Sequence, residues 1–146
     1  MATRTLAALA VAAGASFACT VTEPNAPSID VRVEHRSYVR GTVGVALVRF
    51  ELHNTGRLPA YFLGCQAPIA WVLERNRDGQ WSEASGNSAR CLANIVPALL
   101  ILEPHDSFPD SVRFNLAGFY RLRVWFGGAA RAPYDYSVVS AGFEIR

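Results

Sequence analysis

The chain contains no lysine, and its only methionine is Met1. All fourteen basic residues are arginine, and twelve acidic residues nearly balance them, so the formal net charge is only +2. A protein that binds nucleic acid needs a basic excess to neutralise phosphate groups. Because this chain has almost none, we expect no nucleic-acid partner.

Long hydrophobic runs are also missing. The apolar stretch at residues 6–18 is shorter than the roughly 20 residues that cross a bilayer as a helix. The 146 residues are one domain's length, and 51% apolar residues are enough to fill one core. These features argue against a polytopic membrane protein, a coiled coil and a multi-domain enzyme.

The motifs of common enzymes and metalloproteins are absent from the sequence as well. It has no G-x-S-x-G nucleophile motif and no glycine-rich phosphate loop. His35, His53 and His105 lie far apart, whereas zinc ligands come at short, paired spacings. A copper site would need a histidine soon after Cys65 or Cys91 and usually a methionine, but the chain has no such histidine and no methionine other than Met1. We expect no catalytic residue, no cofactor and no bound metal.

Residues 1–18 have the features of a secretory signal peptide. Arg4 provides a positive start, an alanine-rich apolar stretch follows, and the small residues Ser16 and Ala18 precede Cys19. A buried first helix is the alternative, but the segment after it is rich in proline and threonine and has no periodicity. We expect residues 1–18 to be removed and residues 19–27 to form a tether to a domain at residues 28–146.

Cys19 stands at the expected cleavage point. The segment at residues 16–19 resembles the lipobox of bacterial lipoproteins, although Ser16 replaces the preferred leucine and Phe17 a preferred small residue. Lipidation would also account for the odd one of three cysteines. We expect a lipid anchor at Cys19, with the protein in the outer membrane or facing the periplasm. Soluble secretion after ordinary signal-peptidase cleavage is the alternative.

From residue 28 onward, the sequence predicts short strands separated by turns. Apolar and polar residues alternate, most clearly at residues 119–126, and turn-forming residues follow the strands, as at residues 76–79. The expected strands are residues 29–33, 42–54, 58–63, 69–75, 80–83, 111–114, 119–126 and 139–145. Seven or eight strands at this spacing are typical of an all-β sandwich.

Two segments interrupt this pattern. Residues 84–94 are polar, small and irregular, which predicts a loop. Residues 95–102 are an apolar run that contains Pro97. Eight residues are too few for periodicity to separate a strand from a helical turn.

The order of leucine, glycine and tyrosine at residues 116–122 resembles the tyrosine corner of immunoglobulin-like sandwiches. The strand that ends at Asn54, the hairpin segment at residues 73–81 and the turn at residues 102–104 also resemble bacterial immunoglobulin-like domains of exported proteins. The resemblance covers residues 28–146. It implies an antiparallel immunoglobulin-like β-sandwich in which the Tyr120 hydroxyl bonds to the backbone before it.

The cysteines differ from those of antibody domains, which join two facing strands at positions where this chain has Phe50 and Leu122. Cys65 and Cys91 both lie in the expected exported part, where thiols oxidise. We expect a disulfide between Cys65 and Cys91 that fastens two connections to each other.

The three tryptophans suggest different roles. Trp81 follows the hairpin turn and is expected to pack half-exposed. Trp71 alternates with core positions and is expected to be buried. Trp125 shares the outward face of its strand with Arg121 and Arg123, and an exposed aromatic residue between arginines is typical of protein interfaces. The alternative is that a neighbouring segment covers Trp125 and the arginine stems lie over it.

These observations favour a non-enzymatic, cell-envelope immunoglobulin-like module, which contacts the membrane through its lipid anchor and binds an unidentified protein partner. An exported protease inhibitor that presents the loop at residues 84–94 is one alternative. A module that binds a small ligand or sugar near Trp81 or Trp125 is another.

Overall fold

The structure is a computed structural model that describes residues 26–65, 67, 69–87, 98–131 and 134–146. Among these residues the chain forms strands and turns without any helix, so no membrane-spanning helix occurs in the described ranges. The predicted signal peptide (residues 1–18), Cys19 and nearly all of the predicted tether lie outside the described residues. Their processing and lipidation stay predictions.

Eleven strands make up the described chain. They are β1 (Ile29–Val33), β2 (Ser37–Tyr38), β3 (Ala46–Asn54), β4 (Ala60–Gly64), β5 (Trp71–Arg77), β6 (Gln80–Gly86), β7 (Ala98–Leu102), β8 (Ser107–Phe114), β9 (Gly118–Phe126), β10 (Tyr136–Val139) and β11 (Phe143–Ile145). The number exceeds the seven or eight expected for three reasons. β2 is a separate two-residue strand, the ambiguous run at residues 95–102 contains β7, and the last predicted strand is divided into β10 and β11.

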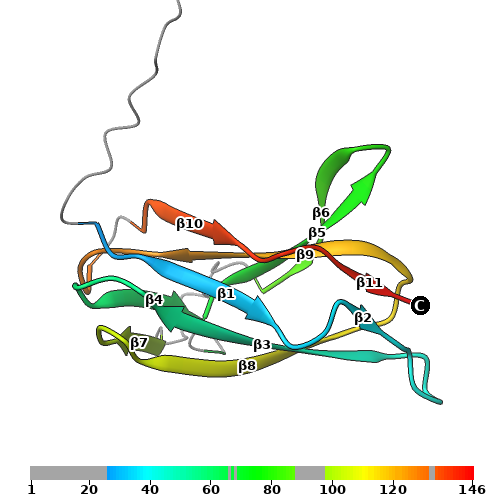
Figure 1. Cartoon of the computed structure of the whole chain (residues 1–146), viewed down its shortest axis with the longest axis horizontal. Coiled ribbons are helices and arrows are strands. Elements are labelled where there is room, and N and C mark those ends of the chain that lie inside the picture. The colour runs from blue at the N-terminus through cyan, green and yellow to red at the C-terminus, as the bar shows by residue number, and fades with distance from the viewer. Residues whose placement is uncertain (1–25, 66, 68, 88–97, 132–133) are drawn as a thin grey trace, which may run out of the picture.

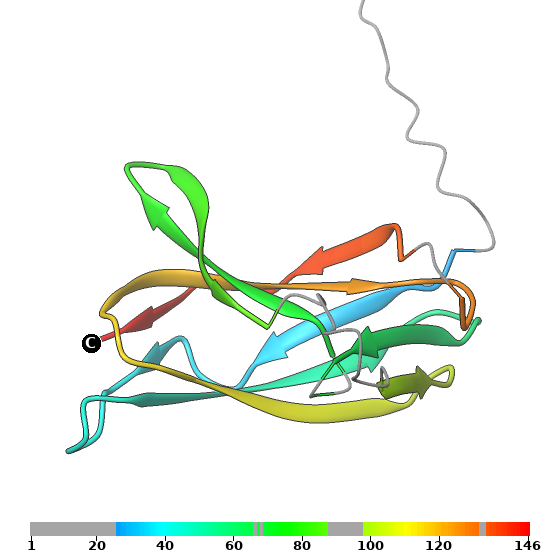
Figure 2. The same ribbon diagram turned by 180° about the vertical axis from the view of Figure 1, so that it is seen from behind.

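Two sheets face each other across one core (Figures 1 and 2). One has the strand order β1-β3-β8; the other has the order β2-β11-β9-β5-β6, with β10 also paired to β9. The N-terminal segment is shared between them, because β1 pairs antiparallel with β3 and β2 pairs parallel with β11. The predicted all-β sandwich is confirmed.

The core follows the alternation seen in the sequence. Val48 and Leu52 of β3 are completely buried, and so are Leu122 and Val124 of β9 on the opposite sheet. Trp71 is half-buried at the start of β5 and packs against this core. Arg49 and Glu51 of β3 and Arg121 and Arg123 of β9 point outward, although the apolar residues Leu47, Phe119 and Trp125 also occupy outward positions.

The turn between β5 and β6 is the predicted tight hairpin. Asp78 and Gly79 have positive φ angles of 53° and 84°, which a two-residue type I′ turn requires at both positions. Asn76 accepts a hydrogen bond from the Gly79 amide at 3.1 Å. The hairpin therefore projects from the sandwich as a twisted two-stranded arm (Figure 1).

The prediction that residues 84–86 belong to a loop is wrong. β6 continues to Gly86, because a register shift opposite Leu73 and Glu74 inserts one extra residue and lets β6 pair with the start of β5. The side chain of Asn87 then donates to the Ile69 carbonyl at 2.8 Å and accepts from the Trp71 amide at 2.7 Å. Residues 88–94, the rest of the predicted loop, lie outside the described residues.

The alternation expected at residues 139–145 is wrong in its first half. Val139 and Ala141 are exposed, whereas Phe143 and Ile145 are buried. A bulge at Ser140 adds one residue opposite β9, and the Ser140 hydroxyl accepts the Leu122 amide at 3.0 Å in place of a backbone carbonyl. The extra residue reverses which face each later side chain occupies.

The ambiguous run at residues 95–102 contains a strand. β7 (Ala98–Leu102) pairs antiparallel with β4 in a separate two-stranded sheet. Residues 95–97 lie outside the described residues. Two backbone hydrogen bonds between Tyr61 and Gly127 attach β4 to the end of β9, so the small sheet adjoins the large one.

Asn54 is a buried polar residue at the end of β3, with 0% of its surface exposed. Its side-chain amide donates to the carbonyl oxygens of Leu58 and Leu102, both at 2.8 Å, and its carbonyl accepts the Gly56 amide at 3.0 Å. One side chain thus provides hydrogen-bond partners for backbone groups in the turn after β3 and at the end of β7.

Tyr120 forms the corner that the resemblance implies. Its side chain is completely buried, and its hydroxyl donates towards the carbonyl oxygens of Leu116 at 3.2 Å and Ala117 at 3.3 Å. Burial raises the pKa of the Tyr120 phenol, although the charges of Arg75 and Arg77 oppose the effect, so the hydroxyl keeps the proton that it donates.

We predict that Tyr120→Phe lowers the free energy of unfolding by about 0.5–1.5 kcal/mol, because it removes one buried hydrogen-bond donor. Urea denaturation measures the change. Tyr134→Phe is the matched control, since the Tyr134 hydroxyl donates to the Ala130 carbonyl at an exposed site. Equal losses in the two variants would contradict a special role for the corner.

We predict a larger loss, about 3 kcal/mol, for Asn54→Leu. The substitution leaves one buried amide and two carbonyl groups without their partner, and each unsatisfied buried group costs about 1–3 kcal/mol. The same denaturation experiment on Asn115→Leu, at an exposed position, serves as control and should change stability by less than about 0.5 kcal/mol. A loss below about 1 kcal/mol for Asn54→Leu would show that water replaces the amide.

Candidate interaction surface

The outward side of the large sheet carries the residues that the sequence singles out. Along β9, Tyr120, Leu122 and Val124 point into the core, so the residues between them point outward. The outward residues of β9 are Phe119, Arg121, Arg123 and Trp125. Glu74 of β5 is the direct cross-strand neighbour of Arg121, which places it in the middle of this outer face.

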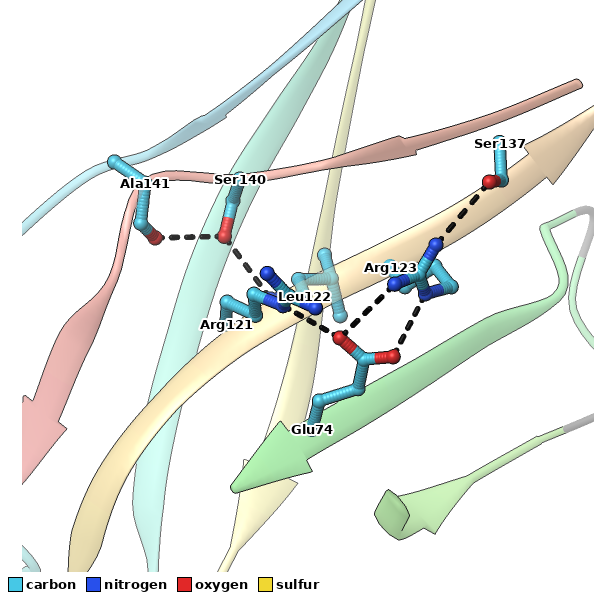
Figure 3. A network of polar contacts seen from close by, with 7 residues as sticks. All are labelled: Glu74, Arg121, Leu122, Arg123, Ser137, Ser140 and Ala141. Atoms are coloured by element: carbon cyan, nitrogen blue, oxygen red, sulfur yellow. Dashed lines mark hydrogen bonds and ion pairs between the residues drawn. The ribbon is translucent and has the colours of Figure 1, made fainter. Parts of the chain in front are cut away.

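Glu74 binds both arginines (Figure 3). Its carboxylate accepts a hydrogen bond from Arg121 Nε at 2.5 Å through one oxygen and from Arg123 Nε at 2.7 Å through the other. Arg123 also donates to the Ser137 hydroxyl of β10 at 3.3 Å. The side chains are mostly shielded from water, with 14% of Glu74, 22% of Arg121 and 27% of Arg123 exposed.

The charge of Glu74 is stabilised by this arrangement. Burial alone would raise the pKa of the carboxyl group, but the hydrogen bonds and positive charges of Arg123 and Arg121 outweigh burial and lower the pKa below its usual value. Glu74 is therefore ionised whenever an ordinary glutamate is. The cluster of Glu74, Arg121 and Arg123 crosses β5 and β9 and reaches β10 through Ser137.

An aromatic pair lies beside the cluster. The guanidinium carbon of Arg121 lies 4.4 Å from the centre of the Trp81 ring, which is a cation–π contact. The Trp81 ring in turn packs against Phe119, with ring centres 5.8 Å apart. Trp81 is half-buried, whereas 47% of the Phe119 surface is exposed. Arg121 is thus held between a carboxylate and an aromatic ring.

Arg121, Arg123 and Trp125 do lie on one outer face, as the sequence predicts, but Arg121 and Arg123 are already paired within the chain. Trp125 is half-buried near the far end of β9, opposite Ser137. The most exposed aromatic residue of the face is Phe119, which was not predicted from the sequence.

Glu74 and Phe119 were missed for different reasons. Two outward arginines two residues apart indicate a nearby acidic partner. Glu74 was one possible partner, because it lies at an outward position of a predicted strand. Only the register of β5 against β9 identifies it, and the sequence does not contain that register. Phe119 begins the outward series of β9, and its alternation alone was signal enough to find it.

The histidines do not form a metal site in the described part of the chain, where no three histidine, cysteine or acidic side chains come together. His53 shares a hydrogen bond of 3.0 Å with Ser107 on the outer face of the three-stranded β1-β3-β8 sheet. Asp30 is the cross-strand neighbour of His53, but its carboxylate binds Arg32 at 2.7 Å. One hollow on this sheet is lined by Arg49 and Asp110 and not by His53.

Cys65 follows β4 directly and is half-buried. Cys91 lies outside the described residues. The predicted disulfide between Cys65 and Cys91 therefore stays a prediction.

We predict that Glu74→Gln lowers the free energy of unfolding by about 1–3 kcal/mol at neutral pH, because two shielded arginines lose their counter-charge. Chemical denaturation measures this loss. The control is Glu34→Gln, which removes an exposed ion pair with Arg49 at 3.7 Å and should cost less than about 1 kcal/mol.

The pH dependence of the free energy of unfolding provides a second test of the same prediction. Because the pKa of Glu74 is lower in the folded chain than in the unfolded chain, its stabilising effect is complete above the ordinary glutamate pKa. The effect disappears as the pH falls through the folded-state pKa. The stability difference between the native chain and Glu74→Gln should therefore shrink between about pH 5 and pH 2. A difference that stays constant over this range would contradict the role of the carboxylate charge.

No protein-family model matches the sequence, and neither does any curated protein. Among solved structures, the chain is similar to the ASH/PapD-like domain 7 of human CEP192, with 17% identity, coverage of 99% of this chain and 96% of that chain, and a TM-score of 0.44. It is also similar to a CARDB domain from Pyrococcus furiosus in complex with di-metal ions, with 9% identity, coverage of 83% and 90%, and a TM-score of 0.39. A β-glucosidase from Listeria innocua matches at 8% identity over 82% of this chain, with a TM-score of 0.38, and the chain spans only 16% of that enzyme's length.

Proposed function

We propose that the chain is a non-enzymatic interaction module of the cell envelope that binds a protein partner through the outer face of its large sheet. The observation that carries the proposal is the pair of Trp81 and Phe119, which presents an exposed aromatic surface next to a fixed arginine. Tryptophan, tyrosine and arginine contribute most of the binding energy in protein interfaces, and phenylalanine is enriched there.

The rigidity of this face supports the proposal. Arg121 is held by Glu74 on one side and by the Trp81 ring on the other, so little side-chain freedom remains to be lost on binding. The cluster of Glu74, Arg121 and Arg123 has a net charge of +1, and Glu83, the exposed cross-strand neighbour of Glu74, adds a negative charge beside it. A partner with an apolar contact for Phe119 and a carbonyl or carboxylate near the arginines fits this surface.

We also propose that Cys19 anchors the module to the outer membrane or the periplasmic side of the envelope through lipid. The signal-peptide pattern and the odd cysteine support this step. The alternative of a secreted inhibitor is less well supported, because residues 84–86 of its expected binding loop are part of β6. A sugar ligand remains the second candidate, since sugars stack on exposed aromatic rings such as Phe119.

A photo-crosslinking residue in place of Phe119 tests the partner proposal in the native envelope. We expect an ultraviolet-dependent protein adduct at this position and none at Val43, an 83% exposed apolar residue in the connection between β2 and β3. Once the partner is identified, Phe119→Ala should weaken its binding about tenfold or more, as expected for an interface hot spot.

Two outcomes would overturn the proposal. Adducts of the same mass at positions 119 and 43 would show unspecific contact, and no adduct at either position would show that the face is free. If Phe119→Ala instead abolishes retention on an immobilised sugar panel, the second candidate is favoured. The anchor is tested separately by intact mass, which should show diacylglyceryl and acyl additions on Cys19.

A further inference from the structure

The sheet formed by β4 and β7 presents an apolar outer face. Its strand register places Tyr61 opposite Ile101 and Leu63 opposite Leu99, while the alternate residues Phe62 and Leu102 are buried. Of these four outward residues, Leu99 is 43% exposed and Ile101 is 45% exposed. We call Tyr61, Leu63, Leu99 and Ile101 the apolar face.

β7 is also an edge strand among the described strands, and Pro97 comes directly before it in the sequence. Its five residues are all apolar, and among the described strands it pairs only with β4. Edge strands in soluble proteins are normally shielded by charges, prolines or a covering segment. Without such protection, an exposed apolar edge pairs with strands of other chains and promotes aggregation. The apolar face therefore needs a cover that the described chain does not supply.

The apolar face lies at the end of the domain where the N-terminal chain emerges. The Thr55 amide donates to the Ser28 carbonyl at 2.8 Å, and the Asn54 side chain next to it binds Leu102 of β7. Tyr61 exchanges two backbone hydrogen bonds with Gly127, at the end of β9. Figure 1 shows β4, β7 and the start of β1 at one end of the sandwich, opposite the C-terminus.

Chain length limits how far this end can move from the anchor. Residue 26, the first described, follows Cys19 by seven positions. Fully extended, seven residues span at most about 25 Å. If Cys19 carries lipid, as proposed above, residue 26 stays within that distance of the bilayer. The end of the domain that includes the apolar face is then at a high effective concentration near the membrane.

We propose that the apolar face docks on the lipid bilayer that holds the Cys19 anchor. Leu63, Leu99 and Ile101 would enter the boundary between headgroups and acyl chains, and Tyr61 would lie at headgroup level, where tyrosine is enriched. The four side chains carry no charge, so docking depends on apolar contact and not on anionic lipid. Docking fixes the orientation of the domain and places its C-terminal end away from the membrane.

The test uses the full mature, lipidated protein in vesicles of phosphatidylethanolamine and phosphatidylglycerol at a ratio of three to one. Ile101→Trp places a fluorescent reporter on the apolar face, and Val43→Trp places a matched reporter at the opposite end of the domain, where Val43 is 83% exposed. Brominated acyl chains in the same vesicles quench indoles that lie in the boundary region. We expect bromination to reduce the added emission of Ile101→Trp about twofold and to leave that of Val43→Trp unchanged.

A second substitution separates docking from anchoring. Leu99→Asp in the Ile101→Trp protein should abolish the quenching, while flotation with the vesicles continues because Cys19 still holds the protein. Equal quenching of the two reporters, or none at Ile101→Trp in protein that floats, would overturn docking and leave the anchor intact. Protein that fails to float shows that the proposed anchoring is wrong.

Self-association is the remaining outcome. If the emission of Ile101→Trp shifts with protein concentration in the absence of vesicles, the apolar face is covered by a second copy through its β7 edge, and the membrane proposal is overturned. Thermal melts and circular dichroism of each variant check that the exposed substitutions leave the fold intact.

Discussion

The side chain of Asn54 holds together the end of the domain from which the N-terminal chain emerges. Buried polar groups must find partners, and at this end the strands stop pairing and leave carbonyl and amide groups behind. One carboxamide supplies two donors and one acceptor, which match Leu58, Leu102 and Gly56. The position of the β4–β7 sheet beside the sandwich depends on this match and on the backbone bonds of Tyr61 to β9.

The strands that could be predicted from the sequence are those whose two faces differ in polarity along most of their length, such as β3 and β9. The prediction failed where a bulge adds one residue, at Ser140 and near Glu74, because an added residue exchanges the two faces without changing the composition. The candidate surface was predicted in part for a related reason. Alternation places Arg121 on the outside, but its carboxylate partner depends on how two distant strands align.

The two candidate surfaces belong to different parts of the fold. The cluster around Glu74 occupies the centre of the large sheet, while the apolar face belongs to the β4–β7 sheet at one end. In the proposed arrangement, membrane and protein partner do not compete, and each surface uses a different interaction. Fixed charges and aromatic rings favour contact with a specific protein. An uncharged apolar surface instead suits contact with a lipid bilayer, which is fluid and chemically uniform.

The division of the N-terminal segment between both sheets has a mechanical consequence. β2 runs parallel to β11, and they are joined by the backbone bonds from Glu144 to Arg36, from Arg146 to Tyr38 and from Arg40 to Arg146. A force that pulls the two chain ends apart draws β2 and β11 in opposite directions along their own axes. All three bonds then carry the load together in shear and do not open one after another. When a pull on the two chain ends reaches β2 and β11, this short parallel pair therefore resists it in shear.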